Sequence, residues 1–433
     1  MSSSSIHLQI TVWLLIISPI AYSRIFPTTN QTLILPLTTQ NSSSSLLFQR
    51  SRLVSSPSIK VPFTYDVALT VSLTAGSPPQ SITMVLDTGS ELSWLKCKQS
   101  STSMFHHVKS SSYSALPCSS PVCTTKTQDF SLPASCDKKT NLCHVVVGYA
   151  DGSTVEGNLA QDTFTIGSST TRATAFGCMD VISSVREEDD KRTGLMGMNR
   201  GRLSFVNQMG LSKFSYCISG SGSTGVLVLG ESSLPSLPPL KYTPLVTLTD
   251  RLPYSDRFAY TVNFEGIRVG SKLLPIPKSD LMRGQSGSGQ TMLDSGTQFT
   301  FLRAPVYKVL KTEFTEQTKS VLTVDPSVVF EEGMELCFRV GSAKPDFSKL
   351  PAVTLMFEGA ELTVSGQKLL YPVPGSGSKK YCFTFGNSEP AGIESFIIGN
   401  LHQQNVWVEY DLAHKKIGFA NGVKCNQASQ QLL

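Results

Sequence analysis

Charged side chains are scarce in this chain of 433 residues: they make up 16%, well below the roughly 25% of an average soluble protein. The net charge of +5 comes from scattered residues and not from a basic run or stripe, so nothing in the sequence indicates nucleic-acid binding. The sequence also lacks an HExxH zinc motif and a GxSxG nucleophile elbow between a strand and a helix. Metalloprotease and serine-hydrolase chemistry are therefore not supported.

Long apolar runs are missing as well, apart from one at the N-terminus. Residues 6–20 are apolar but too short for a comfortable membrane span, and Ala21-Tyr22-Ser23 fits a cleavage site. We expect a signal peptide over residues 1–23 and no transmembrane helix in the mature chain. An uncleaved anchor is the alternative, because no Lys or Arg precedes the apolar run.

Residues 24–58 are rich in Ser, Thr and Asn and carry glycosylation sequons at Asn30 and Asn41. This composition predicts either a propeptide, which would make the chain a zymogen, or a disordered leader that is retained. In the first case the mature protein begins between residues 59 and 64.

The chain contains ten cysteines, and behind a signal peptide they indicate an oxidising compartment and up to five disulfides. Their spacing does not suit a zinc site, because Cys118 and Cys123 have no second pair or histidine at metal-binding distance in the sequence. We expect a monomer in the secretory pathway, most simply extracellular or apoplastic, with the vacuole and the endoplasmic reticulum as alternatives.

Two short stretches, residues 84–90 and 291–297, are nearly identical in pattern: Met-Val-Leu-Asp-Thr-Gly-Ser and Thr-Met-Leu-Asp-Ser-Gly-Thr. In each, an apolar run predicts a buried strand that ends in an Asp, followed by a hydroxyl residue, a Gly and a second hydroxyl residue. A carboxylate at such a position is costly unless hydrogen bonds satisfy it. One stretch is commonly just a turn, but two indicate a paired site around Asp87 and Asp294.

Two carboxyls held close together cannot easily both ionise, so one retains a proton while the other is charged. The charged one can take a proton from a water molecule that attacks an amide carbonyl. The protonated one can hydrogen-bond the carbonyl oxygen and stabilise the tetrahedral intermediate. Aspartic proteases are the established example of this chemistry.

At these residues the chain resembles the pepsin-like aspartic proteases of the plant nepenthesin or nucellin type, over residues 63–425. The saposin-like insertion of some plant relatives is missing. The resemblance implies an all-β, bilobal acid-protease fold with a few short helices, and endopeptidase activity by Asp87 and Asp294. It also implies polypeptide substrates bound in extended form, inhibition by pepstatin-type compounds, and no cofactor or metal.

By the same resemblance, six residues support the two carboxyls: Thr88, Gly89, Ser90, Ser295, Gly296 and Thr297. Thr88 and Ser295 would interlock the two loops beneath the site. Ser90 and Thr297 would donate to the outer carboxylate oxygens, while the glycines allow the tight turns.

Residues 145–157 have the composition of a hairpin, two strand-like runs around a turn rich in Asp and Gly. In the family that the chain resembles, this hairpin is the flap over the substrate, and Tyr149 occupies the place of the flap tyrosine. Trp94, seven residues after Asp87, matches a family tryptophan (94 − 87 = 7). The alternatives are a plain surface hairpin and an ordinary core tryptophan.

An internal repeat follows each Asp loop. Thr193-Gly194-Leu195-Met196-Gly197 and Phe396-Ile397-Ile398-Gly399-Asn400 place a glycine 110 residues after Asp87 (197 − 87) and 105 after Asp294 (399 − 294). We expect two lobes related by a pseudo-twofold axis, at residues 59–233 and 241–433, joined by the proline-rich connection 234–240. Residues 305–318 predict an amphipathic helix.

Residues 97–143 form a polar, cysteine-dense stretch that resembles the insertion of nepenthesin-type proteases. The resemblance implies nested bridges within it and further bridges elsewhere, and it leaves Cys97 with Cys178. The expected pairs are Cys118–Cys143, Cys123–Cys136, Cys337–Cys382, Cys217–Cys425 and Cys97–Cys178.

Two other functions compete with the protease. Plant proteins of this fold include seed globulins and xylanase inhibitors with damaged catalytic sites, so a weak or inactive relative acting as an inhibitor or binding protein is the first. The second is a secreted binding or signalling protein stapled by disulfides. Both Asp loops and Tyr149 are intact, which favours the protease.

Overall fold

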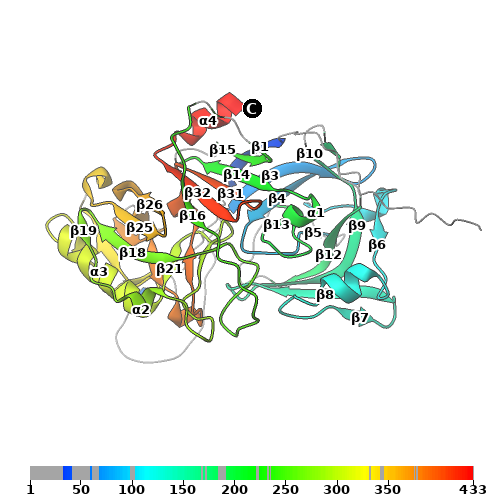
Figure 1. Cartoon of the computed structure of the whole chain (residues 1–433), viewed down its shortest axis with the longest axis horizontal. Helices are drawn as coiled ribbons and strands as arrows, with labels where there is room; N and C mark the ends of the chain where they lie inside the picture. The colour runs from blue at the N-terminus through cyan, green and yellow to red at the C-terminus, as the bar shows by residue number, and fades with distance from the viewer. Residues whose placement is uncertain are drawn as a thin grey trace, which may run out of the picture. The chain divides into compact units, whose positions relative to one another are not determined.

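The computed structural model describes residues 33–40, 59–60, 68–97, 103–166, 169–170, 173–183, 192–220, 224–231, 234, 236–330, 333–341, 346–374, 376 and 379–432. These residues form mainly β-strands with a few short helices, as the sequence predicted (Figure 1). The expected signal peptide and the sequons at Asn30 and Asn41 lie outside the described residues.

The first Asp loop is delivered by a hairpin of β3 (Ala68–Ala75) and β4 (Gln80–Asp87). Its partner is β13 (Gly194–Gly197), which runs parallel to β4 with Gly197 opposite Asp87. Strand β5 (Trp94–Lys96) pairs antiparallel with the other edge of β13. The Asp is thus fixed at the end of a buried strand with a neighbour on each side.

The second Asp loop repeats this arrangement. Strand β20 (Thr291–Leu293) runs parallel to β30 (Phe396–Ile398), and β21 (Thr300–Leu302) pairs antiparallel with β30. The strand that carries each Asp lies beside the apolar element that ends in a glycine. The internal repeat read from the sequence is therefore a repeat in three dimensions.

A row of six strands joins the two halves of the chain (Figure 1). In order, it consists of β1 (Leu33–Gln40), β15 (Thr224–Leu229), β14 (Lys213–Ile218), β31 (Val406–Asp411), β32 (Lys416–Asn421) and β16 (Lys241–Pro244). The central pairing is between β14 and β31, with Phe214 opposite Tyr410. β1 is the end strand of this row in the first half of the chain, and β16 is the end strand in the second half.

Strand β1 corrects one of the alternatives for the leader. It lies within residues 24–58 but pairs with both β15 and β3, and its Leu35 and Leu37 belong to the main hydrophobic core. Residues 33–40 form an ordered strand, so the leader is not disordered throughout. Their alternating apolar side chains are what a strand with one buried face needs.

The remaining elements complete the two halves. In the first half they are β6 (Ser114–Ala115), β7 (Ser135–Asp137), β8 (Leu142–Gly148), β9 (Thr154–Asp162), β10 (Phe164–Ile166), β11 (Ser169–Thr170), β12 (Thr174–Ser183), α1 (Phe205–Gln208) and the single turns η1 (His107–Lys109) and η2 (Val122–Lys126). In the second half, the strands are β17 (Thr261–Val262), β18 (Phe264–Val269), β19 (Lys272–Leu273), β22 (Thr323–Val324), β23 (Val328–Val329), β24 (Cys337–Arg339), β25 (Val353–Phe357), β26 (Ala360–Val364), β27 (Leu370–Pro372), β28 (Lys380–Phe383) and β29 (Phe385–Asn387). The helices there are α2 (Lys278–Leu281), α3 (Ala304–Thr318), α4 (Cys425–Leu432) and the turns η3 (Phe347–Lys349), η4 (Gly366–Lys368), η5 (Glu389–Ala391) and η6 (Asn400–Gln403). Residues 59–60 form β2, which pairs with β23.

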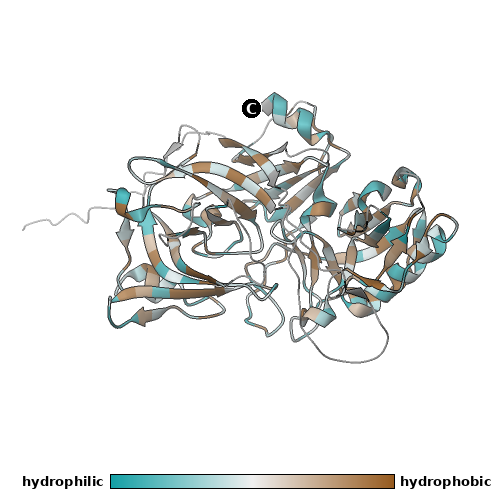
Figure 2. Ribbon diagram, turned by 180° about the vertical axis from the view of Figure 1, so that it is seen from behind, coloured by the Kyte–Doolittle hydropathy of each residue, from teal (hydrophilic) through white to brown (hydrophobic). Residues whose placement is uncertain are grey.

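Helix α3 confirms the one helix expected from the sequence. It spans Ala304–Thr318 with Pro305 in its first turn, where a missing N–H costs nothing. Its buried face includes Leu310 and Phe314, and the Phe314 ring stacks on Phe383 of β28 at 4.3 Å between centroids. Apolar residues recur along the strands of the central row, whereas α4 is mostly hydrophilic (Figure 2).

Three disulfides match the expected pairs, namely Cys97–Cys178, Cys217–Cys425 and Cys337–Cys382. The nested pairing expected within the insertion is wrong: the bridges are crossed. They are Cys118–Cys136 and Cys123–Cys143.

Burial explains the crossed pairing. Cys123 and Cys143 both lie in the hydrophobic cluster under the insertion, while Cys118 and Cys136 lie nearer the solvent. Cys136 is opposite Cys143 in the β7–β8 ladder, yet the two buried sulfurs bond to each other and the two outer ones do the same. Nested bridges would have joined each inner cysteine to an outer one.

Among the residues that the structure describes, no helix combines the length and the apolar character needed to cross a bilayer.

The ordered β1 strand generates a prediction about stability. The Leu37 side chain is 1% exposed, so Leu37→Ala should lower the free energy of unfolding by about 2 to 5 kcal/mol, as for other buried leucines. Urea unfolding of the full chain measures this, with the exposed Thr38→Ser as the control in the same strand. Equal midpoints for Leu37→Ala and the parent would show that β1 does not contribute to the fold.

Candidate active site

The backbone fixes both aspartates through the strands beside them. The Met198 N–H after β13 donates to the Asp87 carbonyl at 2.8 Å. In the other half, the Asp294 N–H donates to the Ile398 carbonyl of β30 at 3.1 Å. Each Asp loop is therefore anchored by the element that the sequence repeat placed about 105 to 110 residues downstream (399 − 294 and 197 − 87).

Each carboxyl is held by donors from its own loop. The Gly89 N–H donates to Asp87 Oδ1 at 2.8 Å, and the Ser90 hydroxyl donates to Asp87 Oδ2. The Gly296 N–H donates to Asp294 Oδ1 at 2.8 Å. The Thr297 hydroxyl donates to Asp294 Oδ2, so the two loops use matching donors, as expected.

The two glycines bring the carboxyls together. A Cβ atom on Gly89 would stand 2.7 Å from Asp294 Oδ1, and one on Gly296 would stand 2.4 Å from Asp87 Oδ1. No real Cβ atom approaches an oxygen so closely. Each loop therefore needs its glycine because the carboxyl of the other loop occupies the space.

Thr88 and Ser295 interlock beneath the carboxyls. The Thr88 N–H donates to Ser295 Oγ at 3.0 Å, and the Ser295 N–H donates to Thr88 Oγ1 at 2.9 Å. The Ser295 hydroxyl also donates to the Leu86 carbonyl at 2.8 Å. Because all these groups are buried, separating the loops would leave several polar atoms without a hydrogen-bond partner.

Burial and proximity change the acidity of Asp87. Its pKa is raised well above the usual range, first because the side chain is buried and second because the Asp294 carboxylate is close. The donors Ser90 and Gly89 oppose this rise without cancelling it. The pair is therefore built to retain one proton at a pH where isolated aspartates have lost theirs.

Glu91 is a further carboxyl with a raised pKa that the sequence did not single out. It follows directly after the first catalytic loop, and its Oε1 accepts from the Leu203 N–H at 2.8 Å. Burial raises its pKa to about 7, and that hydrogen bond from Leu203 only partly opposes the rise. Its position next to Ser90 was visible in the sequence, but its burial was not.

The hairpin of β8 and β9 carries Tyr149 at its tip, as expected. The Trp94 Nε1–H donates to the Tyr149 hydroxyl at 2.6 Å, so the two aromatics identified from the sequence are in direct contact. The negative charge of Asp87 helps to raise the pKa of Tyr149, after the larger effect of burial. The structure thus brings Tyr149 and Trp94 into contact, within range of the Asp87 charge, and the closing of the hairpin over substrate stays a prediction.

The cysteine-rich insertion is tied to the rest of the chain by Asp129. Its side chain is 5% exposed and pairs with Arg251 and Arg257, which precede β17, and with Arg202 at 3.6 Å. Three guanidinium groups around one carboxylate compensate the cost of burying it. The insertion therefore contacts residues from both halves of the chain.

Metal binding is not supported by the described residues. One group, Cys97, His107 and Cys178, has its ligand atoms close enough together, but the two sulfurs are bonded to each other. Only the histidine could still bind an ion.

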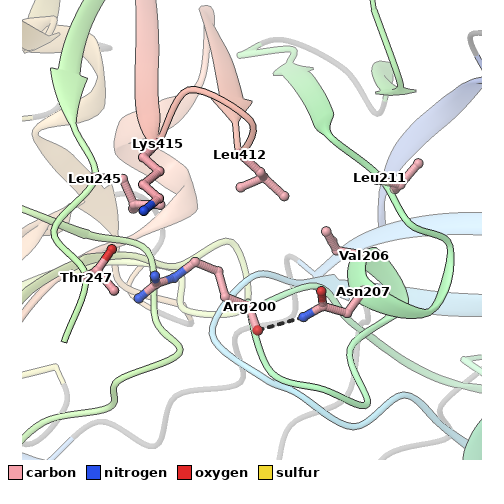
Figure 3. A pocket seen from close by; sticks show the side chains of 8 residues that line it. All are labelled: Arg200, Val206, Asn207, Leu211, Leu245, Thr247, Leu412 and Lys415. Atoms are coloured by element: carbon pink, nitrogen blue, oxygen red, sulfur yellow. Dashed lines mark hydrogen bonds between the residues drawn. The ribbon is translucent and has the colours of Figure 1, made fainter. Parts of the chain in front are cut away.

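Figure 3 shows a cavity whose volume is about 260 Å³. Its lining comes from both halves of the chain, and in Figure 3 the Asn207 amide donates to the Arg200 carbonyl at 2.7 Å. The lining residues are Arg200, Val206, Asn207, Leu211, Leu245, Thr247, Leu412 and Lys415. Neither aspartate is among them, so this cavity is not the catalytic centre.

Comparisons with known proteins agree with this geometry. Residues 69–231 match the domain model described as xylanase inhibitor N-terminal, and residues 259–421 match the one described as xylanase inhibitor C-terminal. Aspartic proteinase PCS1 of Arabidopsis thaliana is 53% identical over 391 residues, which cover 87% of this chain and 86% of the relative. Aspartic proteinase nepenthesin-2 of Nepenthes gracilis is 34% identical over 379 residues, 85% of this chain and 80% of the relative.

Solved structures support the fold. Basic 7S globulin from soybean has a TM-score of 0.63 at 20% identity, covering 90% of this chain and 96% of that chain. Conglutin gamma from lupine seeds has a TM-score of 0.66 at 18% identity, covering 92% and 96%. At such low identity these likenesses show the fold alone.

The relatives named aspartic proteinases, together with the bilobal β fold, identify this chain as an aspartic-type endopeptidase. The chain carries both domain models and belongs to the plant nepenthesin-type, pepsin-like aspartic proteases.

The contact between Trp94 and Tyr149 generates a prediction about turnover. Tyr149→Phe removes the hydroxyl that accepts from Trp94, so it should lower kcat/KM on a peptide substrate by about tenfold, the value of one buried hydrogen bond. The melting temperature should change little. The half-exposed Tyr254→Phe is the control. A parallel loss of activity and melting temperature would instead identify a hairpin with a structural role only.

Proposed function

We propose that this protein cleaves internal bonds of polypeptides at acid pH by means of the Asp87/Asp294 pair. One observation carries the proposal: each carboxyl occupies the space that the glycine of the opposite loop leaves open. That reciprocal fit forces the two carboxyls to share a site. Such a pair activates water without a metal or an organic cofactor.

In the proposed mechanism, the ionised member of the pair takes a proton from a bound water molecule as its oxygen attacks the peptide carbonyl carbon. The protonated member donates to the carbonyl oxygen, which becomes a hydroxyl of the tetrahedral intermediate. A hydroxyl of the intermediate then gives its proton to the carboxyl that has just become ionised. The leaving amine takes a proton from the other, now protonated, carboxyl as the C–N bond breaks. The donors Ser90, Gly89, Thr297 and Gly296 keep the carboxyl oxygens oriented through these steps.

The substrates are polypeptides, and we propose that they bind in extended form with apolar side chains on both sides of the cut bond. Pepstatin-type inhibitors would occupy the same place. The apolar N-terminal run and the five disulfides support passage through the secretory pathway, with the extracellular space as the proposed destination. We propose a monomer.

The alternative of an inhibitor or binding protein has one observation in its favour, the description of the two matching domain models. An inhibitor would not need two carboxyls with complete sets of donors. Both sets are present here, so the protease is the better supported function.

A substitution at either aspartate tests the proposal. Asp87→Asn and Asp294→Asn should each reduce digestion of denatured globin at acid pH at least about 1000-fold, because an amide can neither take the proton from water nor share it. The exposed Asp250→Asn is the matched control and should digest globin like the parent. Pepstatin should stop the parent and the control alike. Near-parental cleavage by Asp87→Asn would rule out the dyad.

The raised pKa of Asp87 also predicts how stability depends on pH. The folded protein binds this proton more tightly than the unfolded chain, so the free energy of unfolding should fall as pH rises from about 4, the ordinary Asp pKa, towards neutrality. Asp87→Asn cannot ionise and should remove this part of the slope. Melting temperatures measured from acid to neutral pH would show it. Identical slopes in the parent and Asp87→Asn would mean that the Asp87 pKa is unchanged by folding.

A further inference from the structure

Three tyrosines lie buried beneath the interlocked loops. Tyr216 is on β14, Tyr410 is on β31, and Tyr260 directly precedes β17; all three side chains are fully buried. The Tyr410 ring lies 4.4 Å from Tyr260 and 5.7 Å from Tyr216, measured between centroids. Hydroxyls at such depth must find partners within the protein.

The hydroxyls of two of them begin a row of hydrogen bonds. The Tyr410 hydroxyl lies 2.9 Å from the Tyr216 hydroxyl. The Tyr216 hydroxyl donates to Oε1 of Gln403, which is also fully buried.

Gln403 completes the connection to the second catalytic loop. Its Nε2 donates to the Ile398 carbonyl at 2.8 Å. The same carbonyl accepts the Asp294 N–H at 3.1 Å. The row of hydrogen bonds thus begins at Tyr410 and ends at the carbonyl group that positions Asp294.

The hydrogens can be placed in one consistent order. Each hydroxyl has a single hydrogen, and that of Tyr216 goes to Gln403, so Tyr410 must donate to Tyr216. The row therefore runs in one direction, from Tyr410 through Tyr216 to Gln403. The Thr88 hydroxyl lies outside this row, because it accepts the Ser295 N–H and donates to the Leu293 carbonyl at 3.3 Å.

Tyr260 connects the two Asp loops directly. Its hydroxyl donates to the Met198 carbonyl at 2.6 Å, and the Met198 N–H donates to the Asp87 carbonyl at 2.8 Å. The Tyr260 carbonyl accepts the Leu293 N–H at 3.1 Å, immediately before Asp294.

Other titratable groups near these tyrosines are few. Lys213, Glu409 and Asp411 belong to the same two strands but form ion pairs with one another, with Lys213 Nζ at 3.4 Å from Glu409 Oε1. They alternate with Phe214, Tyr216 and Tyr410 along the strands and so lie on the opposite face. On the tyrosine side, the charges that act are Asp294 on Tyr216 and Tyr410, and Arg200 on Tyr260.

We propose that Tyr410, Tyr216 and Gln403 are positioning residues that hold the two catalytic carboxyls at a fixed separation. The inference rests on the proposed function of the Asp87/Asp294 pair. None of the three side chains needs to touch substrate. They act on the second loop through the Ile398 carbonyl. On the first loop they act through the Tyr260 ring, which contacts Tyr410 and whose hydroxyl donates to the Met198 carbonyl.

A fixed separation has a measurable consequence. Two carboxyls that are held together lose their protons in two steps, and the closer they lie, the further apart the steps are in pH. If the support is removed, the carboxyls can move apart and repel each other less. The acid and alkaline limbs of the pH profile should then approach each other.

Full-length Tyr410→Phe and Tyr216→Phe test this, with Tyr307→Phe on α3 as a matched control that removes the same atom from another buried tyrosine. Steady-state kinetics on one peptide substrate across the acid range, below the melting temperature of each variant, give the readout. We expect kcat to fall by about tenfold in each variant while KM changes by less than about twofold. The bell-shaped curve of kcat against pH should become narrower at both its acid and its alkaline side. The control should have the same curve as the parent.

The double variant separates a connected row from independent contacts. Because the two hydroxyls serve one row, kcat of the Tyr216→Phe/Tyr410→Phe protein should fall much less than the product of the single losses. A profile of parental width in both single variants, or losses confined to melting temperature, would overturn the inference while the parent still cleaves. A parent without pepstatin-sensitive cleavage would overturn the proposed function itself, and the inference with it.

Discussion

The active site depends on one constraint: two carboxyls must be held together in a place where neither can be fully solvated. Coulomb repulsion and burial both oppose this arrangement, and together they raise the pKa of Asp87. The crossed hydrogen bonds of Thr88 and Ser295 compensate it, because the loops cannot separate without breaking them. The glycines of the two loops, the parallel strands beside each Asp and the buried residues beneath all serve to keep that crossing in place.

Below the crossing, the two halves of the chain are joined by β14 and β31 and not merely by the connection at residues 234–240. The tyrosines of these strands share a hydrogen bond, and Tyr216 also donates to Gln403, which in turn donates to the Ile398 carbonyl beside the second Asp loop. Above it, the Trp94–Tyr149 contact links the first loop to the hairpin. Asp129 joins the cysteine-rich insertion to arginines of both halves, so the parts outside the duplicated core are also tied to it.

The sequence predicted what repeats or has a strong local pattern. The two Asp loops, their downstream apolar partners, the hairpin around Tyr149 and helix α3 all follow from periodicity and spacing. It did not predict what depends on burial. The crossed bridges of Cys118 and Cys123 depend on which sulfurs face the core, and Tyr410, Tyr216 and Gln403 appear as ordinary strand and turn residues until the halves are paired. The strand at residues 33–40 was hidden by the polar composition around it.

The most direct test of a shared proton is the titration of the carboxyls themselves. In protein labelled with carbon-13 at aspartate carboxyls, one member of the pair should remain protonated well above pH 4, where ordinary aspartates titrate. In Asp294→Asn, where Asp87 has no charged neighbour in the pair, the titration of the remaining carboxyl should move to lower pH, since the repulsion that raises its pKa is gone. If both carboxyls of the parent instead titrate independently near pH 4, and Asp294→Asn leaves Asp87 unchanged, then the two aspartates do not form a catalytic pair.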